Sequence, residues 1–242
     1  MWKWLYQFAS PKLFYIKTSS WIKGLQFLCP VLFLLGFFWG VFFAPADYQQ
    51  GDAFRIIYIH VPAAFFSMGL YVGMGVAAFV LLVWRVKIAG VMLLAMAQTG
   101  SVMVVIALVT GSIWGKPMWG AWWVWDARLT SELILFLLYV AILATHHAFV
   151  SKGKADKVVA ILTLVGLLDL PIIHYSVYWW NTLHQGATLS VFAKPKIATS
   201  MAMPLYVMLA AFLSYVIWIV LLKTRSKILH RKSNQKWVQE LA

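Results

Sequence analysis

The chain has 242 residues, of which 63% are hydrophobic and only 11% are charged. Soluble proteins contain about 45–50% apolar and about 25% charged residues, and a soluble globule of this length could not bury the excess apolar surface. The composition therefore indicates an integral membrane protein. It excludes disordered chains, disulfide scaffolds and functions that need a large water-soluble domain. The net charge of +13 is the charge expected of loops on one side of a membrane, so we expect membrane lipid and no nucleic acid as a partner.

Six apolar runs are each long enough to cross a bilayer as a helix of about 20 residues. Barrel strands would instead alternate over about 10 residues. We therefore predict an all-α integral membrane protein, in which residues 1–242 form a single domain, a bundle of six transmembrane helices. The expected spans are 25–44, 60–84, 91–113, 128–149, 158–178 and 201–222.

Basic residues predict the orientation of this bundle. Fifteen of the twenty Lys and Arg residues lie in the N-terminal segment, in loops 85–90 and 150–157, and in the basic tail 223–242. The positive-inside rule then places both termini in the cytoplasm. Loops 45–59, 114–127 and 179–200 face outward. Residues 1–23 alternate basic with aromatic side chains, which is typical of an interfacial segment on the cytoplasmic surface.

The most unusual segment is the tryptophan-rich loop 114–128, which has five tryptophans within twelve residues: Trp114, Trp119, Trp122, Trp123 and Trp125. An aromatic belt at the membrane interface is one explanation, although a belt needs only one or two per helix end. A rigid aromatic platform is the other. If residues 118–126 are helical, Trp119, Trp122, Trp123 and Asp126 share one face. Such a platform suits a flat amphipathic ligand, such as a porphyrin or a sugar ring.

Two histidines from different outer loops flank this segment. His60 stands two residues before Pro62, where loop is expected to become helix, and His184 lies in the third outer loop. Neutral imidazole is a common axial ligand of haem iron, but an interfacial histidine is often an ordinary polar residue. From the residues alone, both interpretations of the pair stay open.

Charged residues near the loops are candidates for contacts with haem propionates. Arg55 and Arg128 are outward-side cations that can bind carboxylates through two hydrogen bonds. Asp126 either orients Arg128 or caps the fourth helix. Asp169 in the fifth span is an ionisable residue inside a membrane segment, and its role is not determined by the sequence.

Residues 119–126 match the pattern WGxxWxWD. With six spans, this motif in an outward loop and a histidine in each flanking outer loop, the whole chain resembles the WWD-domain haem-handling family of cytochrome c maturation. The resemblance implies that haem b is held non-covalently at the periplasmic face of the bacterial inner membrane. It makes His60 and His184 the axial ligands of the haem iron. Trp119, Trp123, Trp125 and Asp126 match the signature, and we add Trp114, Trp122, Arg55 and Arg128 as further candidates for the pocket.

The resemblance also implies partners. Proteins of this kind deliver haem to the periplasmic haem chaperone CcmE, and they assemble with the ATPase CcmA, the membrane subunit CcmB and the small subunit CcmD. This sequence has no GxxxxGK[ST] motif, so we expect no ATPase and no enzyme activity in this chain. The alternatives are an exporter permease without haem, an electron-transferring membrane cytochrome b, and a binder of lipid-linked glycans.

Overall fold

The structure, a computed structural model, describes residues 7, 9–186 and 196–241. Six helical segments in this part of the chain are long and apolar enough to cross a membrane, and the described residues form no β-strand. The prediction of an all-α bundle with six spans is confirmed. Its elements are α2 (Pro11–Phe38), the π-helix η1 (Trp39–Phe43), the 3₁₀ helix η2 (Asp52–Ile56), α3 (Ile57–Trp84), α4 (Lys87–Trp119), α5 (Ala127–Ala148), α6 (Lys152–Gly166), α7 (Asp169–Trp179), α8 (Thr199–Arg231) and α9 (Lys236–Gln239).

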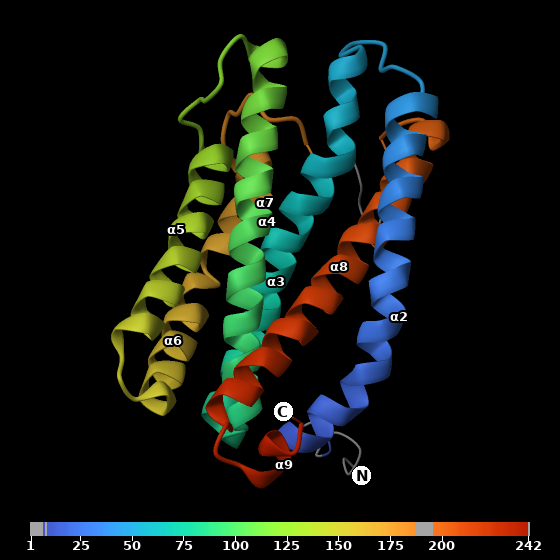
Figure 1. Cartoon of the computed structure of the whole chain (residues 1–242). Helices are drawn as coiled ribbons and strands as arrows, with labels where there is room; N and C mark the ends of the chain where they lie inside the picture. Colours follow the sequence, from blue (N-terminus) through green and yellow to red (C-terminus); the bar gives the residue numbers. More distant parts are fainter. Residues whose placement is uncertain (1–6, 8, 187–195, 242) are drawn as a thin grey trace.

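The helices pack around α3 and α4 (Figure 1). On one side lie α5, α6 and α7, whereas α8 crosses the bundle diagonally and carries α2 on its outer side. Loops 44–51, 120–126 and 180–186 lie together at one end, which we call the loop end. The start of α2 and the helix α9 lie at the opposite end, which we call the terminus end. This grouping agrees with the division of the loops that the basic residues predict.

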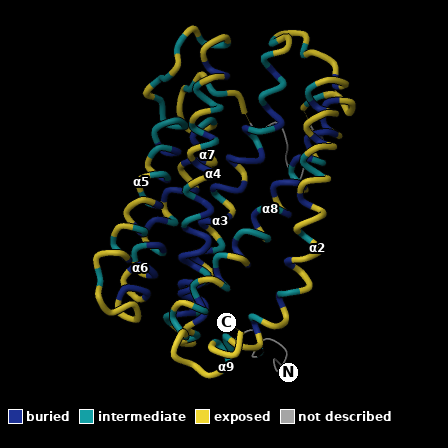
Figure 2. Tube along the Cα trace, in the orientation of Figure 1, coloured by how far each residue is buried: buried dark blue, intermediate teal, exposed yellow. Residues whose placement is uncertain are grey.

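Burial follows this arrangement (Figure 2). Most of the fully buried large side chains belong to α3, α4 and α5, among them Tyr58, Tyr71, Met103 and Tyr139. The helix α2 and the π-helix η1 that follows it instead expose a long apolar face, with Phe27 at 73% and Phe43 at 79% exposure. In a membrane protein such a face meets lipid tails or a neighbouring helix, so the exposed apolar surface costs nothing there.

Helix bounds differ from the predicted spans at several places. Helix α2 begins at Pro11 and runs through the described part of the predicted interfacial segment, while residues 1–6 and 8 lie outside the described residues. Helix α4 continues to Trp119, so the first six residues of the predicted loop 114–128 are helical. Helix α3 begins at Ile57, directly after η2, so Pro62 lies inside the helix rather than at its first turn. Of the predicted outer loop 179–200, residues 187–195 are outside the description.

The predicted fifth span is a broken helix. It consists of α6 and α7, which are separated by a turn at residues 167–168. Asp169 begins α7 directly after the break and is buried. A break inside a membrane segment is tolerated where neighbouring protein covers it, and here Leu167 packs against Gly75 of α3.

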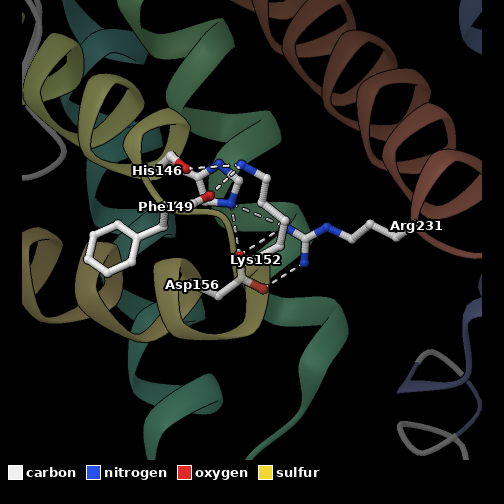
Figure 3. A network of polar contacts seen from close by, with 5 residues as sticks. All are labelled: His146, Phe149, Lys152, Asp156 and Arg231. Carbon is white, nitrogen blue, oxygen red and sulfur yellow. Dashed lines mark hydrogen bonds and ion pairs between the residues drawn. The ribbon is translucent and has the colours of Figure 1, made fainter.

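A network of polar side chains connects the helices at the terminus end (Figure 3). Two guanidinium nitrogens of Arg231 donate to the two carboxylate oxygens of Asp156, at 2.6 and 2.8 Å. His146 Nε2 lies 3.2 Å from Asp156 Oδ1, and Lys152 Nζ donates to the carbonyl of Phe149 at 2.9 Å. We call His146, Lys152, Asp156 and Arg231 the terminus-end network. It joins the consecutive helices α5 and α6 to α8, whose Arg231 is 75 residues from Asp156.

Candidate functional site

A hollow of about 400 Å³, including its open mouth, lies at the loop end between α3, α4, α5 and segment 180–186. Small and apolar residues of α3 and α4 form much of its wall. The aromatic and ionisable residues that line it are His60, Trp119, Trp123, Arg128, Glu132 and His184.

The two predicted histidines face each other across this hollow. Their ring centres are 6.3 Å apart, with 39° between the ring planes. Two imidazoles that bind one metal ion from opposite sides, each through a nitrogen at about 2.0 Å, have ring centres roughly 6 Å apart. The spacing of His60 and His184 is therefore the spacing of a pair of axial ligands.

Hydrogen bonds fix which nitrogen of each ring is available. His60 Nδ1 lies 3.1 Å from the carbonyl oxygen of Ala107 and 3.1 Å from Thr110 Oγ1. His184 Nδ1 lies 2.7 Å from the carbonyl oxygen of Gln185. A carbonyl can only accept, so each Nδ1–H donates and each Nε2 keeps its lone pair. Metal-binding histidines show this pattern, in which the second ring nitrogen donates to a carbonyl.

His184 is also in the protonation state that a ligand needs. Burial and the nearby Arg128 guanidinium lower the pKa of His184 to about 4, against the smaller opposing effects of the Gln185 carbonyl and Asp126. Both main causes disfavour the imidazolium form. At pH 7 the side chain is therefore neutral, which is the form that binds a metal.

The structure brings three of the five tryptophans to the histidines. Trp119 and Trp123 line the hollow, and the Trp119 ring centre is 6.2 Å from that of His184. Trp114 is buried behind His60, with the ring centres 5.6 Å apart and the planes nearly perpendicular. Its indole N–H donates to Gln50 Oε1 at 2.8 Å. Trp122 and Trp125 are 57% and 76% exposed and do not line the hollow.

The condition for a shared helical face, that residues 118–126 are helical, is not met in the structure. Helix α4 ends at Trp119, and Gly120 has φ of 74°, the left-handed conformation that commonly ends a helix. The following residues have no helical structure until Ala127. Trp119 and Trp123 reach the hollow from two different backbone conformations rather than from one platform.

Asp126 caps helix α5. Its Oδ1 accepts a hydrogen bond from the Leu129 backbone N–H at 2.8 Å, and Oδ2 accepts one from the Thr182 hydroxyl. No ion pair joins Asp126 to Arg128 among the described residues. Of the two predicted roles, capping is therefore confirmed. The second hydrogen bond was not foreseen, and it ties the segment that carries His184 to the start of α5.

The two predicted arginines differ in position. Arg128 lines the hollow, and its Nη1 donates to the Ile173 carbonyl at 2.6 Å. The structure does not bring Arg55 there. Arg55 Nη1 instead donates to three carbonyl oxygens at the end of the first span, on Gly40, Val41 and Ala44, at 3.1, 2.7 and 2.9 Å. These carbonyls lack partners within their helix, so a nearby guanidinium satisfies them.

Glu132 is the residue of the hollow that sequence reasoning missed. It lies one turn after Arg128 in α5, and its Oε1 accepts a hydrogen bond from Ser67 Oγ of α3 at 2.9 Å. Its Oε2 is buried without a hydrogen-bond partner. The signal that could have identified it is an acidic residue inside a membrane span, which is costly unless it has a function.

Comparison with known proteins agrees with this geometry. The family model described as "CcmC: Heme exporter protein C" matches residues 4–239. The chain is 49% identical over 242 residues to "Heme exporter protein C" of Haemophilus influenzae, with 100% of this chain and 98% of the relative covered. It is 50% identical over 241 residues to "Heme exporter protein C" of Escherichia coli (strain K12), with 100% and 97% covered.

A plant relative extends the comparison beyond bacteria. The "Putative cytochrome c biosynthesis ccmC-like mitochondrial protein" of Marchantia polymorpha is 40% identical over 205 residues, which cover 81% of this chain and 87% of the relative. A family match over nearly the whole length, together with relatives of about half identical sequence, establishes the relationship. This multi-pass membrane chain belongs to the heme exporter protein C (CcmC) family.

Proposed function

We propose that this chain binds haem b non-covalently in the hollow at the loop end and delivers it to the haem chaperone CcmE during cytochrome c maturation. His60 and His184 are the axial ligands of the iron in this proposal. The observation that carries it is their 6.3 Å spacing, together with an Nδ1 on each ring that is engaged by a backbone carbonyl. The names of the relatives, which are heme exporters, support the same cargo.

Other residues of the hollow fit a flat cargo with anionic groups. Trp119 and Trp123 offer aromatic surface for a porphyrin ring. Arg128 offers a guanidinium to a propionate, and the buried Trp123 Nε1, which has no hydrogen-bond partner, offers a further donor. Trp114 packs against His60 on the side away from the hollow. Arg55 lies outside the hollow and stabilises the end of the first span. These groups hold and orient the cargo, and no acid–base step is required of them.

Sidedness and partners complete the proposal. The basic residues gather at the terminus end, so we place that end in the bacterial cytoplasm and the loop end in the periplasm. The exposed Trp122 and Trp125 then lie where CcmE approaches. Because the chain carries no nucleotide-binding motif, we assign ATP hydrolysis to CcmA, in a complex that also contains CcmB and CcmD.

The visible spectrum of the detergent-purified protein tests the ligand assignment. We expect the wild type to show low-spin, non-covalent haem b, and His60→Ala and His184→Ala each to lose or shift that spectrum. His174→Ala is the matched control, because His174 is exposed on α7 and contacts Tyr175 rather than the hollow. A haem stain of co-expressed CcmE should fall in parallel, at least tenfold, in the two ligand variants. A colourless wild type and unchanged loading of CcmE in both variants would contradict the proposal.

A further inference from the structure

Beneath the hollow lies a second group of polar side chains, which the proposed binding of haem does not use. We call Ser67, Tyr71, Glu132, Tyr139 and Asp169 the carboxyl cluster. Ser67 Oγ donates to Glu132 Oε1 at 2.9 Å, and the Tyr139 hydroxyl donates to the Ser67 carbonyl at 2.7 Å. The rings of Tyr71 and Tyr139 meet edge to face with centres 5.2 Å apart. Asp169 interacts electrostatically with Glu132 and Tyr71.

Among the residues that the structure describes, three oxygens of this cluster are buried without a hydrogen-bond partner. They are Glu132 Oε2, Asp169 Oδ2 and the Tyr71 hydroxyl. The residues that carry them are 6%, 7% and 0% exposed. Buried polar atoms in proteins almost always have a protein or water partner, so three such atoms in one region indicate that something else occupies it.

No cation neutralises the two carboxyl groups directly. Among the described residues, no ion pair involves Glu132 or Asp169. Arg128 is close enough to interact electrostatically with Glu132, but its Nη1 donates to the Ile173 carbonyl. Two ionised carboxylates here would repel each other and would be unpaired inside a membrane, where an unpaired charge is very costly. A buried carboxyl group usually avoids this cost by binding a proton, which makes it neutral.

We propose that Glu132 and Asp169 form a proton-binding site, in which the two carboxyl groups share one proton at neutral pH and internal water bridges them to the Tyr71 hydroxyl. With one proton bound, the pair carries a single negative charge, which the positive charge of Arg128 balances. Water fits because a buried water molecule needs two to four polar partners, and the three unpartnered oxygens supply them.

The charged and titratable groups that face the site from each element are few. Helix α3 contributes Tyr71, helix α5 contributes Arg128, Glu132 and Tyr139, and α7 contributes Asp169. Helix α4 places Gly100 against Tyr139, and helix α6 places Gly166 against Tyr71. Glu132 also lines the hollow, so it connects the site to the space in which cargo binds.

This connection has a consequence that rests on the proposed function. When a propionate binds Arg128, the guanidinium no longer balances the charge of the carboxyl pair. The pair then takes up a second proton, which enters from solvent through the hollow. Haem binding is therefore accompanied by proton uptake, and the floor of the occupied site stays uncharged.

Infrared spectroscopy of the cargo-free protein tests the site without relying on haem. A protonated carboxyl group has a C=O stretching band that carboxylates and amides lack and that shifts in D₂O. Only seven Asp and Glu residues occur in the chain, so the band can be assigned. We expect it in the wild type at pH 7, displaced in Glu132→Gln or Asp169→Asn and lost in the double variant. Asp156→Asn is the matched control, because both oxygens of Asp156 already accept hydrogen bonds from Arg231.

The proposal is overturned if the wild type lacks the band at pH 7, or if both carboxyl variants leave it unchanged. If these variants do not fold, Tyr71→Phe keeps both acids and removes only the third oxygen of the site. The band should then change its position, and an unchanged position overturns the site. In a weakly buffered solution, added haem should cause proton uptake by the wild type that Glu132→Gln abolishes. A protein that shows the infrared band but binds no haem would contradict the proposed function alone.

Discussion

Asp156 in the terminus-end network and Glu132 beneath the hollow are both buried carboxyl groups of one helical bundle, but their surroundings differ. Both oxygens of Asp156 accept hydrogen bonds from Arg231, and His146 adds a third contact (Figure 3). Glu132 has one oxygen bonded to Ser67 and one without a partner. Both oxygens of Asp156 therefore have protein partners, whereas Glu132 has one oxygen that is open to a proton or a ligand.

The difference separates a structural site from a functional one. A satisfied network fixes the relative positions of α5, α6 and α8 and needs no other component. Unsatisfied buried atoms reduce stability, so a protein retains them where binding compensates for their cost. The loop end concentrates such atoms around and below the hollow, including Trp123 Nε1. Under the proposed function, the loop end is the part of the bundle that receives cargo, whereas the terminus end holds the helices in place.

The largest effect on stability is expected from breaking the terminus-end network. Arg231→Met leaves the buried Asp156 with His146 as its remaining side-chain partner. Removing one partner of a buried ion pair typically costs 3–5 kcal/mol, and because Arg231 is partly exposed we expect about 3 kcal/mol. Thermal unfolding in detergent, followed by tryptophan fluorescence, measures the loss.

Two variants sharpen this measurement. Lys232→Met alters the neighbouring charge, which has no side-chain partner in the network, and should change stability by less than about 0.5 kcal/mol. Adding Asp156→Asn to Arg231→Met removes the uncompensated charge and should restore part of the loss. Equal stability of the Arg231 and Lys232 variants would show that the network contributes nothing.

A smaller effect on stability is expected when alanine replaces either of two glycines, one packed against the carboxyl cluster and one packed against the terminus-end network. A Cβ on Gly166 would overlap the Tyr71 hydroxyl and would lie 2.9 Å from Tyr71 Cζ. A Cβ on Gly90 would lie 3.1 Å from Asp156, a contact that a small shift relieves. We expect Gly166→Ala to cost about 2 kcal/mol through overpacking, and Gly90→Ala to cost less than about 1 kcal/mol.

Gly69→Ala provides the control for these two variants. Gly69 lies on α3, and no atom lies within 4 Å of the position that an added methyl group would take. Alanine should therefore be neutral there or stabilise the helix by about 0.5–1 kcal/mol. Unfolding measurements that rank the cost of Gly90→Ala above that of Gly166→Ala would reverse the expected order. In that case the terminus-end network, and not the carboxyl cluster, would be the more tightly packed of the two sites.

The architecture could be predicted from the sequence because hydropathy is a local property. Six apolar runs are visible directly, but the exact ends of the helices are not. Hydropathy falls where polar residues begin, whereas α2 and α4 continue through Lys12 and Lys116 into the interface. The break at residues 167–168 was also not visible, since apolar residues continue through it and Leu167 depends on tertiary contact with Gly75.

The part of the candidate site that could be predicted consists of residues whose type alone indicates their chemistry. Histidine and tryptophan in outer loops identify His60, His184, Trp119 and Trp123, and the structure brings all four together. The position of Arg55 depends on the carbonyls of a helix eleven to fifteen residues earlier in the chain. The importance of Glu132 depends on Ser67, 65 residues away. Neither relationship leaves a pattern in the sequence.

The smallest predicted effect compares two tyrosine hydroxyls within the carboxyl cluster. Tyr139→Phe removes the hydrogen bond to the Ser67 carbonyl and should cost about 1 kcal/mol, the usual net value of one such bond. Tyr71→Phe removes a hydroxyl that has no protein partner. In a dry site that change would be neutral or stabilising, whereas in the hydrated site proposed above it removes a water contact and should cost a few tenths of a kcal/mol. Unfolding curves of the two variants, measured side by side at pH 7, distinguish these cases. A Tyr71→Phe protein that is more stable than the wild type would indicate a dry site. The carboxyl cluster would then contain no internal water, and the proposed contrast with the terminus-end network would be lost.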